Sequence, residues 1–394
     1  MNAATRQFIE THLKDDVRRL ALARFPDDVD KILALNQIEA RQLLSKKVPS
    51  WASDSGLLFP GHLSIEQCSS ELTARYKASI INKGDVFIDL TGGFGIDCYF
   101  LSENFKEAYY VENQKELCEL AEHNFNVLGK NIKVINADAE TFLNQMPATD
   151  NTLIFIDPSR RDAYNRKMVS LHDCSPDVVD LQNVLLKNAK NVLIKASPML
   201  DISLITNELK NISEIHIVSV KNECKEILIK IEQGFDGEIK YHCVNFIGNN
   251  LKSSQSFEFF ETSMCSAISG FATTIKRYLY EPNAALMKAG AFKLVSQRFG
   301  IDKLHINSHL YTSDNLISDF PGRVFEVVGF APFNKKIKKE LLKNETEASV
   351  ATRNFPLTSN ELRKVLNLKE SDENFVFGTT MAGERKMVVL CKKI

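Results

Sequence analysis

The sequence predicts an α/β protein in which a mainly parallel sheet stands between a helical N-terminal region and a C-terminal α+β region. Between residues 84 and 232, short apolar runs alternate with stretches of three- and four-residue apolar spacing, as in strands joined by covering helices. Only residues 221–225 separate the last two runs, which is too few for a crossover helix. These two strands should therefore form an antiparallel hairpin.

Residues 1–80 should form the helical N-terminal region, because they contain no β-rich run. Apolar side chains recur at helical spacing from Phe8 onward. Pro49 and Pro60 interrupt this pattern before a further helical stretch at 65–81, which we expect to lie against the sheet.

The central domain should span residues 81–235 and contain seven strands. The apolar runs that predict them are 86–90, 108–112, 132–137, 152–157, 191–196, 214–220 and 226–232. Because strands buried on both faces read as continuous apolar runs, the first five should form a parallel sheet with helices on both sides.

Residues 236–394 should form the C-terminal α+β region, which begins after the turn at 234–237. A helix is expected at 284–299, where Gly300 ends it. From about 323 to 394 the pattern reads strand, helix, strand, strand, which predicts a compact module.

The composition excludes several classes of protein. A formal charge of -1 gives the whole chain no strong attraction to polyanions, so binding to nucleic acid would need a local basic patch. No apolar stretch is long enough to cross a bilayer, and the N-terminal residues do not resemble a secretion signal. The eight cysteines are scattered without metal-ligand spacing, so we expect a cytoplasmic protein with reduced thiols, no metal site and no membrane partner.

The main candidate for a ligand site is the string DLTGGFG at 89–95, directly after the first predicted strand. Its glycines permit a sharp turn and let a ligand approach the backbone. Glu112 ends the second predicted strand and Asp138 follows the third. Because the carboxyl ends of parallel strands meet at one edge of a sheet, Glu112 could accept two ribose hydroxyls there and Asp138 an adenine amine.

The spacing of this loop distinguishes two adenosine-containing cofactors. A dinucleotide site needs G-x-G-x-x-G, but Thr91 replaces the first glycine and the later spacing is Gly93-x-Gly95. Asp89 precedes the loop at the end of the strand. S-adenosylmethionine has no phosphate and carries a sulfonium and an ammonium group, which favour a nearby carboxylate. The pattern therefore favours S-adenosylmethionine as the cofactor.

The strings DLTGGFGID, VEN, NADAE and IDP resemble, in order and spacing, motifs I to IV of class I S-adenosylmethionine-dependent methyltransferases. The strings EQCSSELTARYKA, DPSRR, YLYEPNAALMKAG and FPGRVFEVVG are similar to those of bacterial THUMP-like methyltransferases. The resemblance implies a Rossmann-like sheet, methyl transfer from S-adenosylmethionine, and a C-terminal THUMP-like or ferredoxin-like module. THUMP modules of related enzymes bind tRNA or other RNA.

The same resemblance implies cofactor contacts in motifs I to III and in the helix before motif I. These residues are Asp89, Thr91, Gly93, Gly95, Glu112, Asn113, Asp138, Ala139, Thr73 and Lys77. Motif I should contact the methionine part, motif II the ribose and motif III the adenine. For Thr73 and Lys77, a helix that only docks on the sheet explains the same pattern.

The string DPSRR at 157–161 stands where amino-directed methyltransferases carry a second proline and then an aromatic residue. Asp157, Arg160 and Arg161 are the candidate catalytic residues. Asp157 could orient or deprotonate the acceptor, and the two arginines could hold a phosphate or carboxylate of the substrate. Alternatively, one arginine pairs with a neighbouring aspartate and has a structural role.

Three further features each have a functional and a structural interpretation. Cys174 could attack a pyrimidine base, although an isolated cysteine is more often buried packing. Lys195 follows the fifth predicted strand and faces either the substrate cleft or solvent. The segment 334–343 contains five lysines, which indicates either an RNA-binding patch or a solvated helix face.

Three functions are compatible with these patterns. The first is methylation of structured RNA, either tRNA or rRNA, which the C-terminal region would bind. The second is methylation of a small molecule or a protein, and the third is a non-catalytic module that binds S-adenosylmethionine or RNA. The oligomeric state stays open.

Overall fold

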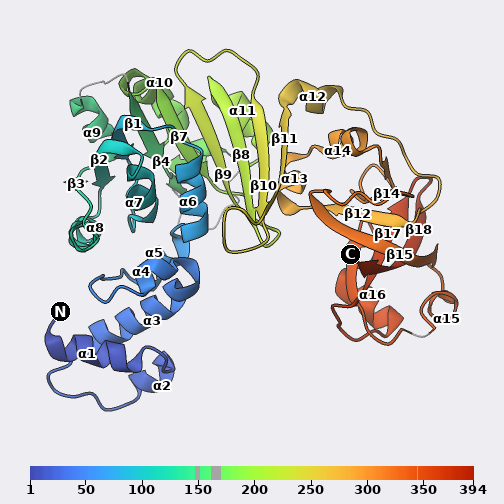
Figure 1. Ribbon diagram of the computed structural model, residues 1–394, viewed down its shortest axis with the longest axis horizontal. Coiled ribbons are helices and arrows are strands. Elements are labelled where there is room, and N and C mark those ends of the chain that lie inside the picture. The colour runs from blue at the N-terminus through green and yellow to red at the C-terminus, as the bar shows by residue number, and fades with distance from the viewer. Residues whose placement is uncertain (147–150, 161–169, 344) are drawn as a thin grey trace. The chain divides into compact units, whose positions relative to one another are not determined.

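The computed structural model describes residues 1–146, 151–160, 170–343 and 345–394 (Figure 1). The chain divides into two compact units. The first contains Met1–Ile215, Glu226–Gly237 and Asn249–Lys252, and the second contains His216–Lys225, Glu238–Gly248 and Ser253–Ile394. The helical N-terminal region thus belongs to the same unit as most of the central sheet.

Residues 1–80, all of which are described, form six helices. They are α1 (Ala3–His12), α2 (Val17–Ala21), α3 (Lys31–Lys47), α4 (Pro49–Ala52), α5 (His62–Gln67) and α6 (Glu71–Ser79). Asn2, Asp16 and Asp30 begin the first three, because each side chain accepts a hydrogen bond from a backbone N–H of the first turn. The single helix predicted at 65–81 is wrong: Ser70 caps a new helix, so that α5 and α6 are separate.

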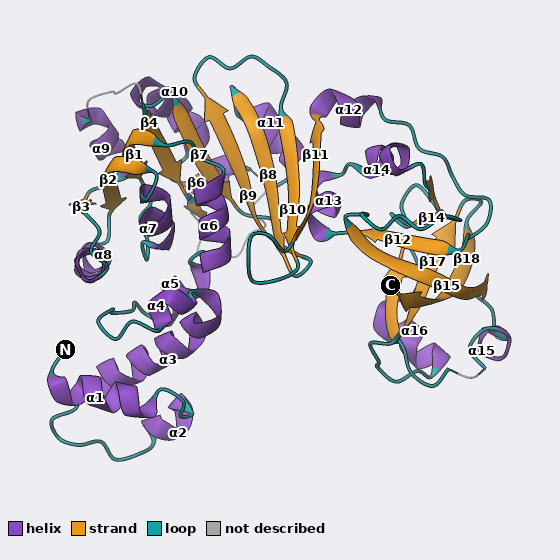
Figure 2. Cartoon of the chain, in the orientation of Figure 1, coloured by secondary structure: helices purple, strands orange, loops and turns teal. Residues whose placement is uncertain are grey.

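The central sheet confirms the predicted α/β fold (Figure 2). Its strands are β1 (Gly84–Asp89), β2 (Phe105–Glu112), β3 (Ile132–Asn136), β4 (Thr152–Ile156), β7 (Asn191–Ala196), β8 (Ile212–Val220) and β9 (Glu223–Glu232). Within a nine-stranded sheet, these seven strands lie in the order β8-β9-β7-β4-β1-β2-β3. The pairs β7–β4, β4–β1, β1–β2 and β2–β3 are parallel, and β9 pairs with β7 antiparallel.

Helices connect the parallel strands of this sheet and lie on both of its faces (Figure 2). They are α7 (Ile96–Ser102), α8 (Lys115–Val127), α9 (Ala139–Gln145), α10 (Val178–Asn188) and α11 (Ile202–Glu208). A short ribbon of β5 (Ser159–Arg160) and β6 (Cys174–Ser175) and the 3-10 helix η1 (Leu171–Asp173) follow β4. All five residues of β4 are buried, which explains why that strand reads as a continuous apolar run.

The turn between β8 and β9 is shorter than the five residues that separate the apolar runs. It consists of Lys221 and Asn222, which have φ values of 51° and 64°. Two consecutive residues in the left-handed region form the kind of tight turn that matches the twist of a hairpin. The predicted hairpin is confirmed.

The second unit contains the antiparallel hairpin β10 (Lys240–Phe246) and β11 (Ser254–Phe260), followed by α12 (Glu261–Ser266). A seven-stranded sheet then has the order β13-β14-β12-β15-β18-β17-β16 in the described chain. These strands are β12 (Tyr278–Pro282), β13 (Asp302–Lys303), β14 (Tyr311–Ser313), β15 (Gly322–Pro332), β16 (Ser349–Arg353), β17 (Asn374–Met381) and β18 (Arg385–Lys393). Its last helices are α15 (Ile337–Glu340) and α16 (Ser359–Leu366).

The helix predicted at 284–299 is two helices, α13 (Ala284–Ala289) and α14 (Phe292–Phe299). Gly290 adopts a left-handed conformation with φ of 72° and ends α13. Gly300 ends α14 in the same way, as predicted. Among the described residues, no helix combines the length and the apolar character that a bilayer-spanning helix needs.

Candidate active site

A cavity of about 440 Å³ lies at the carboxyl ends of the parallel strands of the first unit. Each of five strands contributes a lining residue within one position of its end. These residues are Asp89 (β1), Glu112 (β2), Ala137 (β3), Asp157 (β4) and Lys195 (β7). This edge is where open α/β sheets bind ligands, and the volume is typical of a small-molecule site.

The glycine loop forms one wall of the cavity. Gly93 and Gly95 have φ values of 53° and 88°, which favour glycine. A Cβ atom on Gly92 would lie 2.2 Å from the ring of Tyr110, so the loop packs directly on that ring. The Tyr110 hydroxyl also donates a hydrogen bond to the Gly93 carbonyl at 2.5 Å. Packing and conformation therefore fix the backbone of the loop.

Asp89 and Thr91 connect this loop to the DPSRR segment. The Asp89 carboxylate accepts a hydrogen bond from the Thr91 N–H at 3.0 Å, and burial raises the pKa of Asp89 well above its usual range. The Thr91 hydroxyl accepts a hydrogen bond from the Asp157 N–H at 2.6 Å. Thr91 thus holds the start of the segment that carries the candidate catalytic residues, a role that the sequence did not indicate.

Glu112 and Asp138 both line the cavity, together with their neighbours Asn113 and Ala139. The two Glu112 carboxylate oxygens accept hydrogen bonds from the N–H groups of Gly93 and Gln114, each at 2.9 Å. Asp138 caps α9 by accepting a hydrogen bond from the Thr141 N–H. This hydrogen bond is the main reason that the pKa of Asp138 is lowered. Both carboxylates keep lone pairs for a ligand, because each carboxylate oxygen has two.

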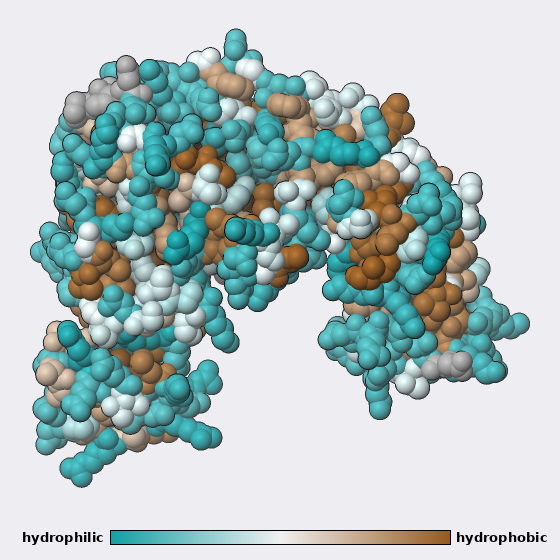
Figure 3. All heavy atoms as spheres, viewed as in Figure 1, coloured by the Kyte–Doolittle hydropathy of each residue, from teal (hydrophilic) through white to brown (hydrophobic). Residues whose placement is uncertain are grey.

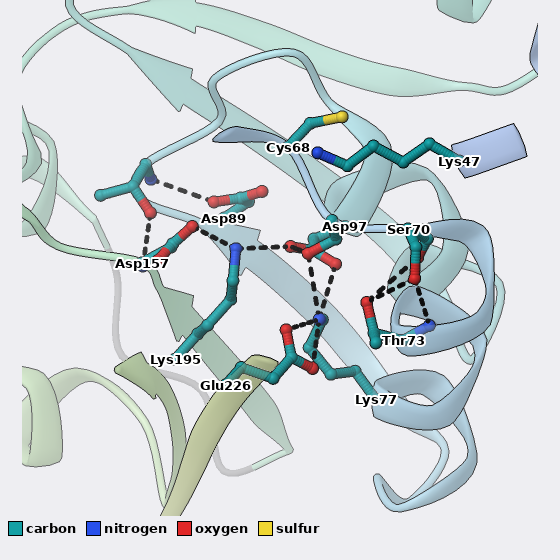
Figure 4. Close-up of polar contacts among 12 residues, drawn as sticks. Lys47, Cys68, Ser70, Thr73, Lys77, Asp89, Asp97, Asp157, Lys195 and Glu226 are labelled. Carbon is teal, nitrogen blue, oxygen red and sulfur yellow. Dashed lines mark hydrogen bonds and ion pairs between the residues drawn. The ribbon is translucent and has the colours of Figure 1, made fainter. Parts of the chain in front are cut away.

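Thr73 and Lys77 do not line the cavity, contrary to the position that the sequence indicated for them. Lys77 is fully buried, with its Nζ 2.8 Å from both carboxylate oxygens of Glu226 and 3.2 Å from Asp97 Oδ1 (Figure 4). The Thr73 hydroxyl donates to the Ser70 carbonyl within the first turn of α6. Both residues fit the alternative interpretation, in which their helix only docks on the sheet.

Other residues of the N-terminal region do line the cavity. They are Ser64 and Gln67 of α5 and Cys68 and Ser69 of the following loop. Beneath the glycine loop, Trp51 packs edge-on against Phe94 with ring centroids 5.2 Å apart. Arg41 holds the adjacent loop by donating to the carbonyls of Ala52, Asp54, Ser55 and Leu57. The N-terminal helices therefore complete the site.

Lys195 lies at the centre of the polar network beside Asp157. Its Nζ is 2.5 Å from Asp157 Oδ2 and 3.5 Å from Asp97 Oδ2 (Figure 4). Burial disfavours the ammonium form, but the charges of Asp157 and Asp97 outweigh burial and raise the pKa of Lys195. The sequence left open whether Lys195 faces the substrate cleft or solvent, and in the structure it faces the cavity.

The β5–β6 ribbon forms the remaining wall, where Ser159, Ser175 and Asp177 line the cavity. Cys174 is buried in this ribbon and does not line the cavity, which disfavours its proposed attack on a base. The backbone of Arg160 pairs with that of Cys174, but the Arg160 side chain and all of Arg161 lie outside the described structure.

The cavity is strongly acidic. Among its described lining residues, seven side chains are carboxylic acids and only Lys195 is basic. The acids are Asp89, Asp97, Glu112, Asp138, Glu140, Asp157 and Asp177. Carboxylates in this number suit the cationic groups of a ligand.

Two family models match the C-terminal part of the chain. One describes a ferredoxin-like domain and matches residues 278–321, and the other describes a domain like the THUMP domain and matches residues 322–393. A comparison with curated proteins finds no match.

A protein of Porphyromonas gingivalis W83 with a solved structure, to which methyltransferase activity is ascribed, is 33% identical to this chain with a TM-score of 0.88. The alignment covers 99% of this chain and 97% of that protein. This chain belongs to the family of THUMP-like class I methyltransferases. The fold and the family that the motifs implied are therefore confirmed for this methyltransferase.

Two more distant structures match only part of this methyltransferase. TrmK of M. capricolum, bound to S-adenosyl-homocysteine, is 13% identical with a TM-score of 0.32, and the match covers 41% of this chain and 68% of TrmK. A Streptococcus mutans protein, also bound to S-adenosyl-homocysteine, is 14% identical with a TM-score of 0.31. That match covers 41% of this chain and 95% of the other.

The lysine-rich segment of this methyltransferase lies in the module that matches the THUMP domain. Ile337 and Leu342 are buried in its core, whereas Lys335, Lys336 and Lys339 are exposed. Figure 3 shows hydrophilic residues around α15 on the visible face. The segment is therefore amphipathic, and its lysines point away from the core.

Proposed function

We propose that this methyltransferase uses S-adenosylmethionine as the methyl donor and methylates a structured RNA, either tRNA or rRNA. The excess of carboxylates in the cavity carries the proposal for the donor. Such a cavity suits the sulfonium and ammonium groups of S-adenosylmethionine.

The residues around the cavity suit the three parts of this cofactor. Glu112 offers its remaining lone pairs to the ribose hydroxyls, and Asp138 offers its own to the adenine amine. Asp89 and the loop that ends at Gly95 would hold the methionine part, because the fixed backbone of this loop lets a ligand approach closely. When bound, S-adenosylmethionine supplies a methyl group that is activated by the positive sulfur. Asp157 would then orient the acceptor.

Two features support RNA as the acceptor. The first is the THUMP domain-like match at 322–393, and the second is the exposed lysines within it. Lysines that neutralise phosphates release bound counterions, so RNA affinity should fall steeply as salt rises.

Isothermal titration calorimetry with S-adenosylmethionine tests the donor. The wild-type protein should bind, and Glu112→Ala should bind about 10-fold more weakly or worse, because it loses hydrogen bonds to a charged group. Lys106→Met is a matched control, since Lys106 pairs with Asp85 on the surface and does not line the cavity. Unchanged affinity in Glu112→Ala would contradict the assigned pocket.

Labelled methyl transfer tests the acceptor. The protein should label total tRNA or rRNA from a strain that lacks the gene, and its RNA binding should weaken with added salt. Replacement of Lys335, Lys336 and Lys339 by Gln should reduce both the affinity and the salt dependence. Label that enters only an RNA-free extract would favour a small molecule or a protein and overturn the RNA assignment.

A further inference from the structure

The N-terminal helical region of this methyltransferase packs along α7, the helix that follows the glycine loop. The guanidinium carbon of Arg75, in α6, lies 4.7 Å from the centroid of the Phe100 ring, which is a cation–π contact. Beyond the end of α7, the Asn104 side chain donates a hydrogen bond to the Ala78 carbonyl at 2.8 Å. Because the first turn of α7 lines the cavity, the helix that the N-terminal region holds is also part of the site.

Asp97 stands in the first turn of α7 and has contacts on two sides. Its Oδ2 accepts a hydrogen bond from the Ser69 hydroxyl at 2.6 Å and lies 3.5 Å from Lys195 Nζ. Its Oδ1 is buried and has no hydrogen-bond donor within the described structure, so only the charge of Lys77 Nζ, 3.2 Å away, holds it. Figure 4 shows Asp97 between the two lysines. The carboxylate therefore meets the N-terminal region on one side and Lys195 on the other.

Asp97 is the central member of a chain of buried ion pairs. Burial alone would raise the pKa of Asp97, but the charges of Lys77 and Lys195 outweigh burial and lower it, so Asp97 is ionised. Lys77 lies between Glu226 and Asp97. Lys195 lies between Asp97 and Asp157. The sign of the charge thus alternates at every step from Glu226 to Asp157.

Attachment of α6 to the sheet does not by itself require this chain to reach the cavity. The Lys77 ammonium contacts both oxygens of Glu226 at 2.8 Å, and this ion pair already joins α6 to β9. Asp97 extends the chain to Lys195, whose Nζ is 2.5 Å from Asp157 Oδ2. The position of Lys195 therefore depends on two carboxylates, and one of them belongs to the residue that we propose to orient the acceptor.

On the basis of the proposed function, we propose that Asp97 is a positioning residue that fixes Lys195 against Asp157. Ser69 and Lys77 hold Asp97 in place, so the N-terminal region acts on the rate of methyl transfer through this one carboxylate. Methyl transfer needs the acceptor in line with the bond that breaks, and a misplacement of about 1 Å can cost about 100-fold in rate. The N-terminal region thus sets the geometry of the reaction as well as building one wall of the cavity.

Substitution of Asp97 by Asn removes the charge and keeps the size of the side chain. The amide has one acceptor oxygen, whereas the Ser69 hydroxyl and two ammonium groups surround it, so at least one of these donors loses its acceptor. Lys195 should move, and kcat should fall about 10- to 100-fold, with a smaller change in the affinity for S-adenosylmethionine measured by calorimetry. Ser69→Ala should lower kcat by a smaller factor, and Ser69→Thr, which keeps the hydroxyl, should restore most of it. Lys106→Met should match the wild type.

A double-mutant cycle on kcat separates a positioning role from a structural one. Lys195→Met should itself lower kcat, and it removes the link between Asp97 and Asp157. Asp97→Asn should then have little further effect, so that the double variant loses about as much as the worse single variant. Losses that multiply would show that Asp97 acts independently of Lys195 and would overturn the inference, as would a wild-type kcat in Asp97→Asn. If Asp97→Asn does not fold, Ser69→Ala takes its place in the cycle.

The substrate of the cycle is the fraction that accepts the labelled methyl group, which keeps this test apart from the test of RNA. If the label enters only a protein or a small molecule, the RNA proposal fails, and the same cycle with that substrate decides the role of Asp97. If no fraction is labelled, the proposed function fails, and crystal structures of the wild type and of Asp97→Asn decide instead. Lys195 Nζ should lie farther from Asp157 in the variant, and an unchanged distance of 2.5 Å would overturn the inference.

Discussion

Replacement of Lys77 by Met should destabilise the first unit strongly, because Lys77 is the partner of two buried carboxylates. Its Nζ contacts both oxygens of Glu226 at 2.8 Å and Asp97 at 3.2 Å, and its side chain is fully buried. Asp97 would keep Lys195 and Ser69, but Glu226 would lose the lysine that binds both of its oxygens. Removing one member of a buried ion pair costs about 3–5 kcal/mol.

The double variant Lys77→Met/Glu226→Leu separates the loss of the ion pair from the loss of packing. Replacing both members of a buried pair by apolar residues is often close to neutral, so the double variant should recover at least about half of the lost stability. Lys106→Met is the control, because its ion pair with Asp85 at 2.6 Å is exposed and should contribute less than about 1 kcal/mol.

Urea denaturation followed by tryptophan fluorescence measures these free energies of unfolding. Trp51 is the single tryptophan, it is buried, and it belongs to the same unit as Lys77. A loss in Lys77→Met as small as that in the control would refute the reasoning, as would a double variant less stable than the single one. If Lys77 instead contacted the cofactor, Lys77→Met would weaken S-adenosylmethionine binding and leave stability unchanged.

Three further changes have defined outcomes. Gly92→Ala should weaken S-adenosylmethionine binding in calorimetry, because its Cβ would overlap a tyrosine ring, whereas Gly61→Ala, with open space around it, should not. Burial lowers the pKa of His309 to about 4, so the unfolded state binds the proton first and thermal stability should fall as pH drops from about 6.5 to about 4. His309→Gln should abolish that dependence. Glu281→Gln should lower the melting temperature of the second unit, because two arginines lose their shared buried carboxylate.

The fold was predictable from the sequence wherever local patterns determine structure. The buried strands read as apolar runs, and the short gap before β9 left room only for a hairpin. Errors arose at helix boundaries. The break between α5 and α6 depends on the Ser70 cap, and the break between α13 and α14 on the left-handed Gly290, and both stand inside otherwise helical patterns.

The site was predictable only in part, because its motifs are local and its charge pairs are not. The loop after β1 and the acids at the ends of β2 and β3 follow from position along the chain. The contact of Lys77 with Glu226 joins residues 149 positions apart, which no spacing rule anticipates. Lys195 and Asp97 are 98 positions apart, so their contact could not be predicted from spacing either. Only the structure shows that they lie beside Asp157.

The charge of the cavity also constrains how an RNA substrate can be bound. The described lining residues include seven carboxylic acids and one lysine, which offer the phosphates of the proposed RNA substrate few partners there. A base can reach such a site only when it is turned away from its own phosphates, as in enzymes that extrude their target base or act on loops. The exposed lysines beside α15 offer the opposite charge in a separate module. Catalysis and RNA affinity should therefore respond to different substitutions: changes at Asp157 should alter kcat, and changes at the lysines should alter KM and its salt dependence.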